Sequence, residues 1–167
     1  MLKPIGIAAL LLFFATRSAY ALDPGDIAPD FTADSLTDHA PMRFSDFHGK
    51  VIYLDFWTSW CAPCRESFPL MEKLSAELGA GGFQVLAVNL DAQPADALKF
   101  LRGQDVHFPV VDGVSESVPE QYGIKAMPAA YIIDRGGTVR AVRSDLRQSE
   151  LKEVRALIVE LLQEAKK

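Results

Sequence analysis

Hydrophobic residues along the chain form two patterns: nearly unbroken runs, and runs in which apolar positions recur every three or four residues. The unbroken runs cover residues 51–57 and 83–90, and runs of this length are typical of strands that are buried on both faces of a sheet. The periodic runs predict two amphipathic helices, one over residues 63–78 and one from an N-cap at Ser149 to Leu162, because such spacing puts the apolar side chains on one helix face.

Shorter patterns fill the stretches between these elements. They predict a helix over residues 94–101, a short strand over 106–111, a short helix over 117–122, and a hairpin of strands 129–134 and 138–143 that turns at 135–137. Residues 22–50 contain turn signals but no clear periodic pattern. Strands that alternate with helices, followed by a hairpin and a last helix, predict a three-layer α/β fold in which helices flank a central mixed sheet.

The N-terminal segment has the pattern of an export signal rather than of a folded element. Lys3 precedes an apolar run over residues 5–14, and the small-x-small sequence of residues 19–21 follows it, which is the order found in secretory signal peptides. The run is too short for a membrane span, which needs roughly 20 apolar residues. We therefore predict a signal peptide over residues 1–21 and one domain over residues 22–167, with an uncleaved N-terminal anchor as the alternative.

The charge of the chain limits the classes of partner that it is expected to bind. With 17 Lys and Arg against 22 Asp and Glu, the formal net charge is −5 at pH 7. The chain has no basic cluster and no stripe of basic and aromatic residues, which argues against nucleic acid as a partner. The length suits one domain with one core, and we predict a monomer.

The two cysteines of the chain, Cys61 and Cys64, lie where the predicted strand 51–57 meets the predicted helix 63–78. A disulfide that closes so short a loop constrains the unfolded chain little, so the spacing favours redox chemistry over structural stabilisation. Free backbone N–H groups at a helix start lower the pKa of a nearby thiol. We therefore predict that Cys61 is exposed and attacks as a thiolate, and that Cys64 is shielded and resolves the mixed disulfide.

Two other interpretations of the cysteine pair compete with this one. The pair could supply half of a zinc site, but the sequence has no second cysteine pair, and its three histidines show no ligand spacing. The pair could also be an inert structural disulfide, which the short loop disfavours. We predict no metal site and no cofactor.

Three further side chains near the cysteines are candidates for the site. Asp55 is the one charged residue of the strand 51–57, and burial of an unpaired carboxylate raises its pKa toward the range that suits proton exchange near neutral pH. The alternative is a partly hydrated Asp55 that is paired with a base. Trp60 is expected to shield the site and to offer an apolar docking surface, whereas Trp57 fits a role in the core or in the site equally well.

Several motifs together resemble a known family. Residues 55–65 are similar to the active-site segment of thioredoxins, Pro69 matches the proline within their first helix, and Met127–Pro128 matches their cis-proline loop. Residues 25–31 and 44–50 resemble the N-terminal extension of the TlpA/ResA branch. Members of that branch are exported thiol–disulfide oxidoreductases, many of them reductases, and the resemblance covers essentially the whole predicted domain.

This resemblance implies a thioredoxin-like fold with an N-terminal extension and a central insertion near residues 92–110. It also implies that the bond before Pro128 is cis and that the proline lies beside the cysteines. The backbone of Met127 would then pair with an extended client peptide, in the manner of an added strand. Asp55 would accept the proton of Cys64.

Three positions depart from these families. ResA-type proteins carry an acid three residues after the second cysteine, where this chain has Ser67, and they usually carry Asn at the position of Asp55. The lysine that neighbours the thioredoxin aspartate is replaced here by Ala87. The proton-accepting acid is therefore expected in the thioredoxin position, without its usual charged neighbour.

The sequence thus predicts an exported, periplasmic thiol–disulfide oxidoreductase that acts through Cys61 and Cys64, and the resemblance implies that it reduces protein disulfides. The resemblance implies protein thiol and disulfide clients, a transmembrane thiol electron donor and a link to cytochrome c biogenesis, although no residue identifies the client or sets the direction. One alternative is a thiol peroxidase, because Thr58 stands three residues before Cys61. However, peroxiredoxins have a proline four residues before this threonine, where this chain has Leu54. Another is a copper or cytochrome-assembly chaperone that uses the dithiol as a soft ligand.

Overall fold

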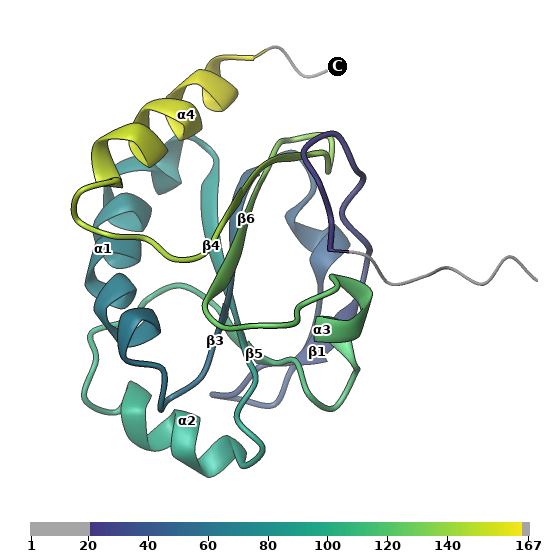
Figure 1. Cartoon of the computed structure of the whole chain (residues 1–167), viewed down its shortest axis with the longest axis vertical. Helices are drawn as coiled ribbons and strands as arrows, with labels where there is room; N and C mark the ends of the chain where they lie inside the picture. The colour runs from purple at the N-terminus through teal and green to yellow at the C-terminus, as the bar shows by residue number, and fades with distance from the viewer. Residues whose placement is uncertain (1–20, 165–167) are drawn as a thin grey trace, which may run out of the picture.

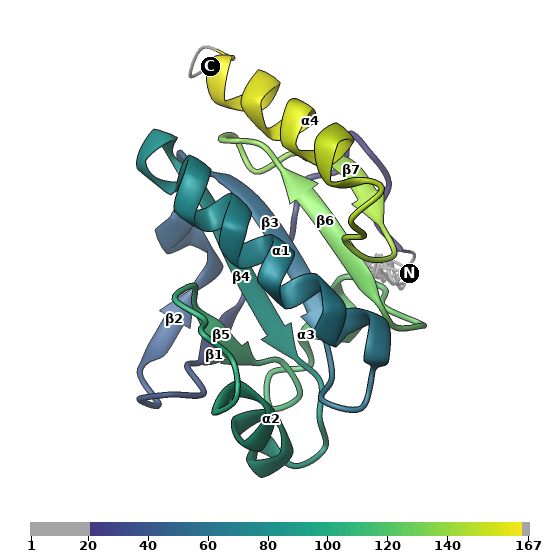
Figure 2. The ribbon, with the colours of Figure 1, turned by 90° about the vertical axis from the view of Figure 1, so that its left-hand side faces the viewer.

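One five-stranded sheet organises the fold, which a computed structural model describes over residues 21–164. In chain order the elements are β1 (Thr32–Asp34), β2 (Pro41–Arg43), the short 3-10 helix η1 (Phe44–Phe47), β3 (Val51–Trp57), α1 (Ala62–Leu78), η2 (Gly79–Gly81), β4 (Phe83–Asn89), α2 (Pro94–Leu101), β5 (Val110–Asp112), α3 (Val118–Gln121), β6 (Ala129–Ile133), β7 (Val139–Arg143) and α4 (Leu151–Gln163). The sheet has the strand order β5-β4-β3-β6-β7 (Figures 1 and 2). Because β3 runs parallel to β4 and antiparallel to β6, the predicted central mixed sheet is confirmed.

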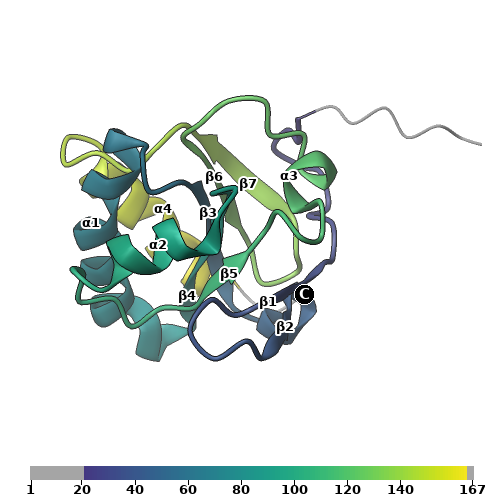
Figure 3. The same ribbon diagram turned by 90° about the horizontal axis from the view of Figure 1, so that it is seen from below.

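The two faces of the sheet are covered by different parts of the chain. Helices α1, α2 and α4 lie on one face, while β1, β2 and α3 lie on the other (Figures 2 and 3). Side chains alternate along a strand, so Tyr53 and Trp57 of β3 join the core cluster beneath the helices, and Leu54 and Phe56 join the cluster beneath the N-terminal extension. The three-layer arrangement predicted from the sequence is therefore confirmed.

Aromatic rings attach the central insertion to the helical face of the sheet. The apolar face of α1 buries Phe68, whose ring packs edge-on against Trp57 of β3, with ring centroids 4.7 Å apart. Phe100 of α2 packs edge-on against the same Phe68 ring at 5.2 Å. The insertion therefore shares its core with the strand and the helix that carry the two cysteines.

The N-terminal extension forms a small hairpin that the sequence analysis missed. Strands β1 and β2 pair antiparallel over three residues each, and within β1 only Ala33 is buried. Strands this short are too brief for a detectable alternating pattern. The hairpin continues to the edge of the main sheet, where the backbone N–H of Leu36 donates to the carbonyl of Val110 at 2.9 Å.

The short strand predicted over residues 106–111 is displaced. Strand β5 covers Val110–Asp112 instead. Pro109 explains where it begins, because proline has no N–H to donate to a strand ladder. Its carbonyl still accepts a hydrogen bond from the backbone N–H of Ala87 at 3.0 Å.

The predicted N-cap of the last helix is also wrong. α4 begins at Leu151 with Glu150 as its N-cap residue, and no side chain caps it. The backbone N–H of Glu150 donates to the carbonyl of Arg147 at 3.0 Å, and this turn leaves Ser149 outside the helix.

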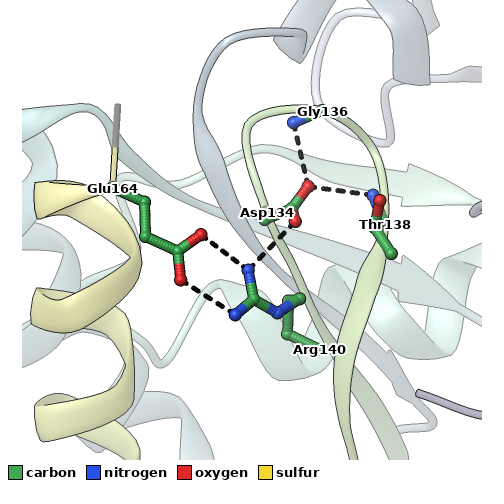
Figure 4. A network of polar contacts seen from close by, with 5 residues as sticks. All are labelled: Asp134, Gly136, Thr138, Arg140 and Glu164. Carbon is green, nitrogen blue, oxygen red and sulfur yellow. Dashed lines mark hydrogen bonds and ion pairs between the residues drawn. The ribbon is translucent and has the colours of Figure 1, made fainter. Parts of the chain in front are cut away.

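Strands β6 and β7 form the predicted hairpin, and its turn is tied to the end of α4 (Figure 4). Within the turn, Oδ1 of Asp134 accepts hydrogen bonds from the backbone N–H groups of Gly136 and Thr138, at 2.9 and 3.0 Å. The Arg140 guanidinium donates to Asp134 at 3.2 Å and to both carboxylate oxygens of Glu164 at 2.7 and 2.8 Å. This network joins the turn of the β6–β7 hairpin to the C-terminal end of α4.

None of the helices described between residues 21 and 164 combines the length and the apolar character that a membrane span requires. The predicted signal peptide lies outside the described residues, apart from Ala21.

Candidate active site

Cys61 and Cys64 lie where β3 passes into α1, and they form a disulfide. Cys61 is the N-cap residue of α1, and its Sγ accepts a hydrogen bond from the backbone N–H of Cys64 at 3.3 Å. In the reduced protein, amides in this position stabilise a thiolate on the first cysteine. The geometry therefore places the pair as the sequence predicted, at the start of a helix.

The predicted exposure of Cys61 is wrong for the disulfide form. Cys61 is 6% exposed, against 1% for Cys64. The disulfide turns the Sγ of Cys61 toward its partner, and both residues join the core cluster beneath the helices. Cys61 is nevertheless the more accessible of the two, which agrees with a role as the attacking thiol.

The two tryptophans next to the pair have different surroundings. Trp60 is 73% exposed and lies in a tight turn that closes where the backbone N–H of Cys61 donates to the carbonyl of Thr58 at 3.2 Å. Trp57 is fully buried in the aromatic core of the helical face. The structure thus assigns Trp57 to the core and leaves Trp60 as a large apolar surface beside the disulfide.

The Met127–Pro128 peptide bond is cis, as the resemblance implied. The next residue, Ala129, pairs with Phe56 of β3, so the bond lies beside the C-terminal end of β3, where the cysteines follow. The Met127 side chain packs against the core cluster that contains both cysteines. The loop predicted to receive a client therefore lies at the same end of the sheet as the disulfide.

Asp55 is buried without a charged partner. It is 1% exposed, and its Oδ2 atom has no hydrogen-bond partner among the described residues. The sheet register places it between Ala87 of β4 and Ala130 of β6, so neither neighbouring strand places a polar side chain directly opposite it. Burial, and after it the charge of Asp145, raises the pKa of Asp55 well above its usual range. A partly hydrated Asp55 paired with a base does not fit this environment.

Asp145 is a second buried acid of this region, and the sequence analysis missed it. It lies between β7 and α4, is 3% exposed, and accepts hydrogen bonds from Nε of Arg147 at 2.9 Å and from Oγ of Ser144 at 3.2 Å. The sequence carries no signal for it, because residues 144–149 show no periodic pattern and only the folded sheet brings this segment near Asp55.

A hollow beside the disulfide connects α1 with this segment. Its volume is about 600 Å³. It is lined by Pro63, Glu66 and Leu70 from α1 and by residues 145–149. Apolar and charged side chains therefore line one hollow beside the first turns of α1.

A larger hollow of about 880 Å³ lies at the far end of β6, around the turn of the β6–β7 hairpin. Its acidic and basic side chains include Asp134, Arg140 and Glu164, which bind one another (Figure 4). We place the chemistry at the smaller hollow, because the cysteines lie at that end. Within residues 21–164, no group of three or more His, Cys, Asp or Glu side chains is arranged to hold a metal ion.

Comparisons with known proteins agree with this assignment. The AhpC/TSA family matches residues 24–142. The thiol-disulfide oxidoreductase ResA of Geobacillus kaustophilus is 32% identical over 142 residues, which cover 85% of this chain and 80% of that protein. A crystal structure from Chlorobium tepidum, described under the name thiol:disulfide interchange protein DsbE, has a TM-score of 0.80 and 42% identity, with 85% of this chain and 99% of that chain covered. The thioredoxin domain of a thiol-disulfide oxidoreductase from Bacteroides vulgatus has a TM-score of 0.74 and 26% identity, with 83% and 99% covered.

Proposed function

Because the chain belongs to the AhpC/TSA family and is a thiol–disulfide oxidoreductase with a thioredoxin-like fold, we propose that it is an exported reductase of protein disulfides. The observation that carries this proposal is the Cys61–Cys64 disulfide at the N-terminus of α1, beside the exposed Trp60. A dithiol in such a position exchanges readily with other disulfides, because the helix start favours its thiolate.

The reaction consists of two disulfide exchanges. The reduced protein attacks one sulfur of a client disulfide with the Cys61 thiolate, which forms a mixed disulfide and releases the other client sulfur as a thiolate. The Cys64 thiolate then attacks Sγ of Cys61, breaks the mixed disulfide and releases the second client sulfur. Two electrons pass to the client, and the enzyme is left with the Cys61–Cys64 disulfide that the structure contains.

The Asp55 carboxylate is the base that accepts the proton of Cys64 in the second exchange. Its side chain shares a face of β3 with Tyr53 and Trp57, the face on which the cysteines lie. A carboxylate whose pKa is raised by burial can take up a thiol proton near neutral pH, which an ordinary aspartate with a pKa of about 3.9 does poorly. The raised pKa of Asp55 supports this role.

Client proteins dock on the surface around the disulfide. Trp60 supplies an exposed apolar ring, and the backbone of Met127, next to the cis bond, offers hydrogen bonds to an extended peptide. Main-chain pairing would supply affinity for unfolded clients without requiring one sequence.

Export explains why the protein would need an external source of electrons. The N-terminal pattern supports delivery to the periplasm, which is kept oxidising. A reductase there has to be re-reduced, and a transmembrane dithiol protein is the partner that this chemistry requires. Apocytochromes c are clients of the kind that such a reductase serves.

Two measurements test this function. The reduction potential of the Cys61–Cys64 pair is measured against a glutathione buffer, and the reduced protein is assayed for reduction of insulin disulfides. A reductase should have a reduction potential well below those of the periplasmic oxidants, the strongest of which has a potential of about −120 mV. It should also reduce insulin at catalytic concentration. A potential near that of those oxidants would identify an oxidase instead.

The alternative functions predict different results in the same preparation. A thiol peroxidase would consume hydrogen peroxide faster than a free dithiol of equal concentration. A copper chaperone would retain Cu(I) in the presence of a chelator, through soft thiolate ligands. We expect neither result.

A further inference from the structure

Asp91, in the loop after β4, holds the loop that follows β3. Its side chain is 4% exposed. Its Oδ2 accepts hydrogen bonds from the backbone N–H of Ser59 and from Nδ2 of Asn89, both at 2.9 Å, and its Oδ1 accepts one from Oγ of Ser59 at 3.0 Å. One buried carboxylate therefore holds Ser59 by both its backbone and its side chain.

Ser59 is the second residue of the tight turn that delivers the first cysteine. The turn runs from Thr58 to Cys61, whose backbone groups close it at 3.2 Å. Trp60, the third residue, projects into solvent, and Cys61, the fourth, caps α1. The hydroxyl of Thr58 is buried without a hydrogen-bond partner among the described residues, so it does not hold the turn.

We propose that Asp91 is a positioning residue for the redox site: by holding Ser59, it fixes the direction of Trp60 and keeps Cys61 at the N-cap of α1. The part of this inference that concerns client docking rests on the proposed function, whereas the part that concerns Cys61 does not. Asp91 lies in the loop after β4 and Ser59 in the loop after β3, so these hydrogen bonds link the two loops.

The position of Cys61 matters because the helix effect is short-ranged. The favourable interaction of a negative charge with a helix start falls off within the first turn. The Sγ of Cys61 is within hydrogen-bond distance of the Cys64 amide only while the turn holds its present shape. If Ser59 is released, the Cys61 thiolate loses part of this stabilisation.

Two substitutions separate the position of Asp91 from its charge. In Asp91→Asn, the amide oxygen can take the place of Oδ2 and accept from Ser59 N–H and Asn89, while the amide nitrogen donates to the Ser59 hydroxyl. Asp91→Ala removes all three hydrogen bonds. Both variants lack the charge, so any difference between them reports the hold on the turn.

The first readout does not depend on the biological direction of the reaction. The reduced proteins are alkylated with iodoacetamide at pH 7, and mass spectrometry follows modification of Cys61. Asp91→Ala should react about two- to five-fold more slowly than Asp91→Asn, which is the size expected for loss of a helix-start interaction. Asp96→Ala, which removes an exposed acid at the start of α2, should react like the parent protein.

The second readout reports on Trp60. The rate of insulin reduction is divided by the rate with a small disulfide, and this ratio should fall at least about three-fold in Asp91→Ala and remain near the parent value in Asp91→Asn, because a displaced docking group costs more with a large client. If the parent proves inactive on insulin, the proposed function fails, and the alkylation result still decides the position of Cys61.

Other outcomes would overturn the inference. Equal alkylation rates in Asp91→Ala and Asp91→Asn would show that the carboxylate does not position Cys61. If Asp91→Ala fails to fold, Ser59→Ala removes only the hydroxyl contact at a half-buried site. That variant should shift alkylation in the same direction by a smaller factor, and an unchanged rate would refute the hold on the turn.

Discussion

The two sulfur atoms of the site differ in access, and this difference leads to a prediction about their roles. Cys61 caps α1 and is the more exposed residue, whereas Cys64 is almost fully enclosed. A Cys64→Ser variant can attack a client but cannot resolve the product, so we expect it to accumulate a mixed disulfide through Cys61. Non-reducing electrophoresis and mass spectrometry of a mixture with a disulfide client measure this. Cys61→Ser is the control and should trap little, and equal trapping by both variants would refute the assignment.

The unpaired carboxylate of Asp55 leads to a kinetic prediction. Asp55→Asn keeps the shape of the side chain and removes the carboxylate that we propose as the proton acceptor for Cys64. We expect nearly normal attack on a client disulfide but slower resolution by about 100-fold, the usual cost of losing a general base. Stopped-flow kinetics with a chromogenic disulfide separate the two steps. Asp96→Asn, at an exposed position, is the matched control, and resolution at the parent rate in Asp55→Asn would exclude the proton-transfer role.

The same carboxylate makes the stability of the oxidised protein depend on pH. Burial raises the pKa of Asp55 above its value in the unfolded chain, so the unfolded chain loses this proton at lower pH than the folded protein does. Between the two pKa values the folded protein binds more protons, and its stability falls as pH rises through that interval. Asp55→Asn removes this loss, so its free energy of unfolding relative to the parent should increase from acidic to neutral pH. Urea titrations at several pH values test this, and a variant that becomes relatively less stable toward neutral pH would indicate an ionised, stabilising Asp55.

Some site residues could be predicted from the sequence and others could not, for a physical reason. Cys61, Cys64 and Asp55 lie within ten residues of one another on one strand and one helix start, so local spacing was sufficient. Asp91 and Asp145 reach the same region from other loops. Their neighbours are decided by strand pairing, which a single sequence does not reveal. The exposure of Cys61 was predicted wrongly because the disulfide draws its sulfur into the core.

At the scale of elements, a close contact between strands leads to a stability prediction. Gly113 follows β5, and a Cβ atom there would lie 2.3 Å from Cγ1 of Val88 and 3.0 Å from Cδ2 of Leu90. Val88 is fully buried in the central sheet and cannot move aside cheaply. Gly113→Ala should therefore reduce the free energy of unfolding by about 1–3 kcal/mol, the usual cost of overpacking, as measured by urea denaturation.

Gly79 provides the matched control for this substitution. It has helical dihedral angles at the end of α1, and a Cβ atom there would meet nothing within 4 Å. Gly79→Ala should leave stability unchanged or increase it by up to about 1 kcal/mol, because alanine restricts the unfolded chain. If both alanine variants behave alike, the close approach at Gly113 is not the cause.

Element length decided which parts of the fold could be predicted. The seven buried residues of β3 and the periodic face of α1 give strong patterns, and both elements were predicted almost to the residue. Strands β1 and β2 have three residues each. They exist because they pair with each other and dock on the edge of the sheet, so their structure is a consequence of tertiary contacts rather than of local propensity.

At the scale of the whole molecule, the redox site forms at one end of the sheet from segments that are far apart in the sequence. The end of β3, the loop before β6 and the segment between β7 and α4 converge there, whereas the network around Arg140 braces the opposite end (Figure 4). The two ends are joined by β6, whose strand pairing spans the distance. Substitutions at the braced end should therefore affect stability more than redox chemistry.

The boundary between the predicted signal peptide and the domain leads to a prediction about the whole chain. Contacts of the described residues with the domain begin at Leu22, which packs against the core cluster beneath the extension, and at Gly25, whose N–H donates to Val139 at 2.8 Å. Cleavage after Ala21 would thus leave these contacts in place. In a bacterium with two membranes, we expect the mature protein in the periplasmic extract with Leu22 as its first residue, as determined by N-terminal sequencing.

Processing can be tested with a pair of variants, because signal cleavage needs small residues at the last and third-last positions of the signal but not between them. Ala21→Tyr places a large ring at the last position and should leave the chain uncleaved and bound to the membrane fraction. Tyr20→Ala changes the middle position and should be cleaved like the parent. If the parent itself is found in the membrane with Met1 still present, the N-terminal run is an anchor, and the domain then acts at the membrane surface. A cleaved periplasmic protein and an uncleaved, anchored one would both have the redox domain in the periplasm. Cytoplasmic protein that begins at Met1 would contradict export altogether.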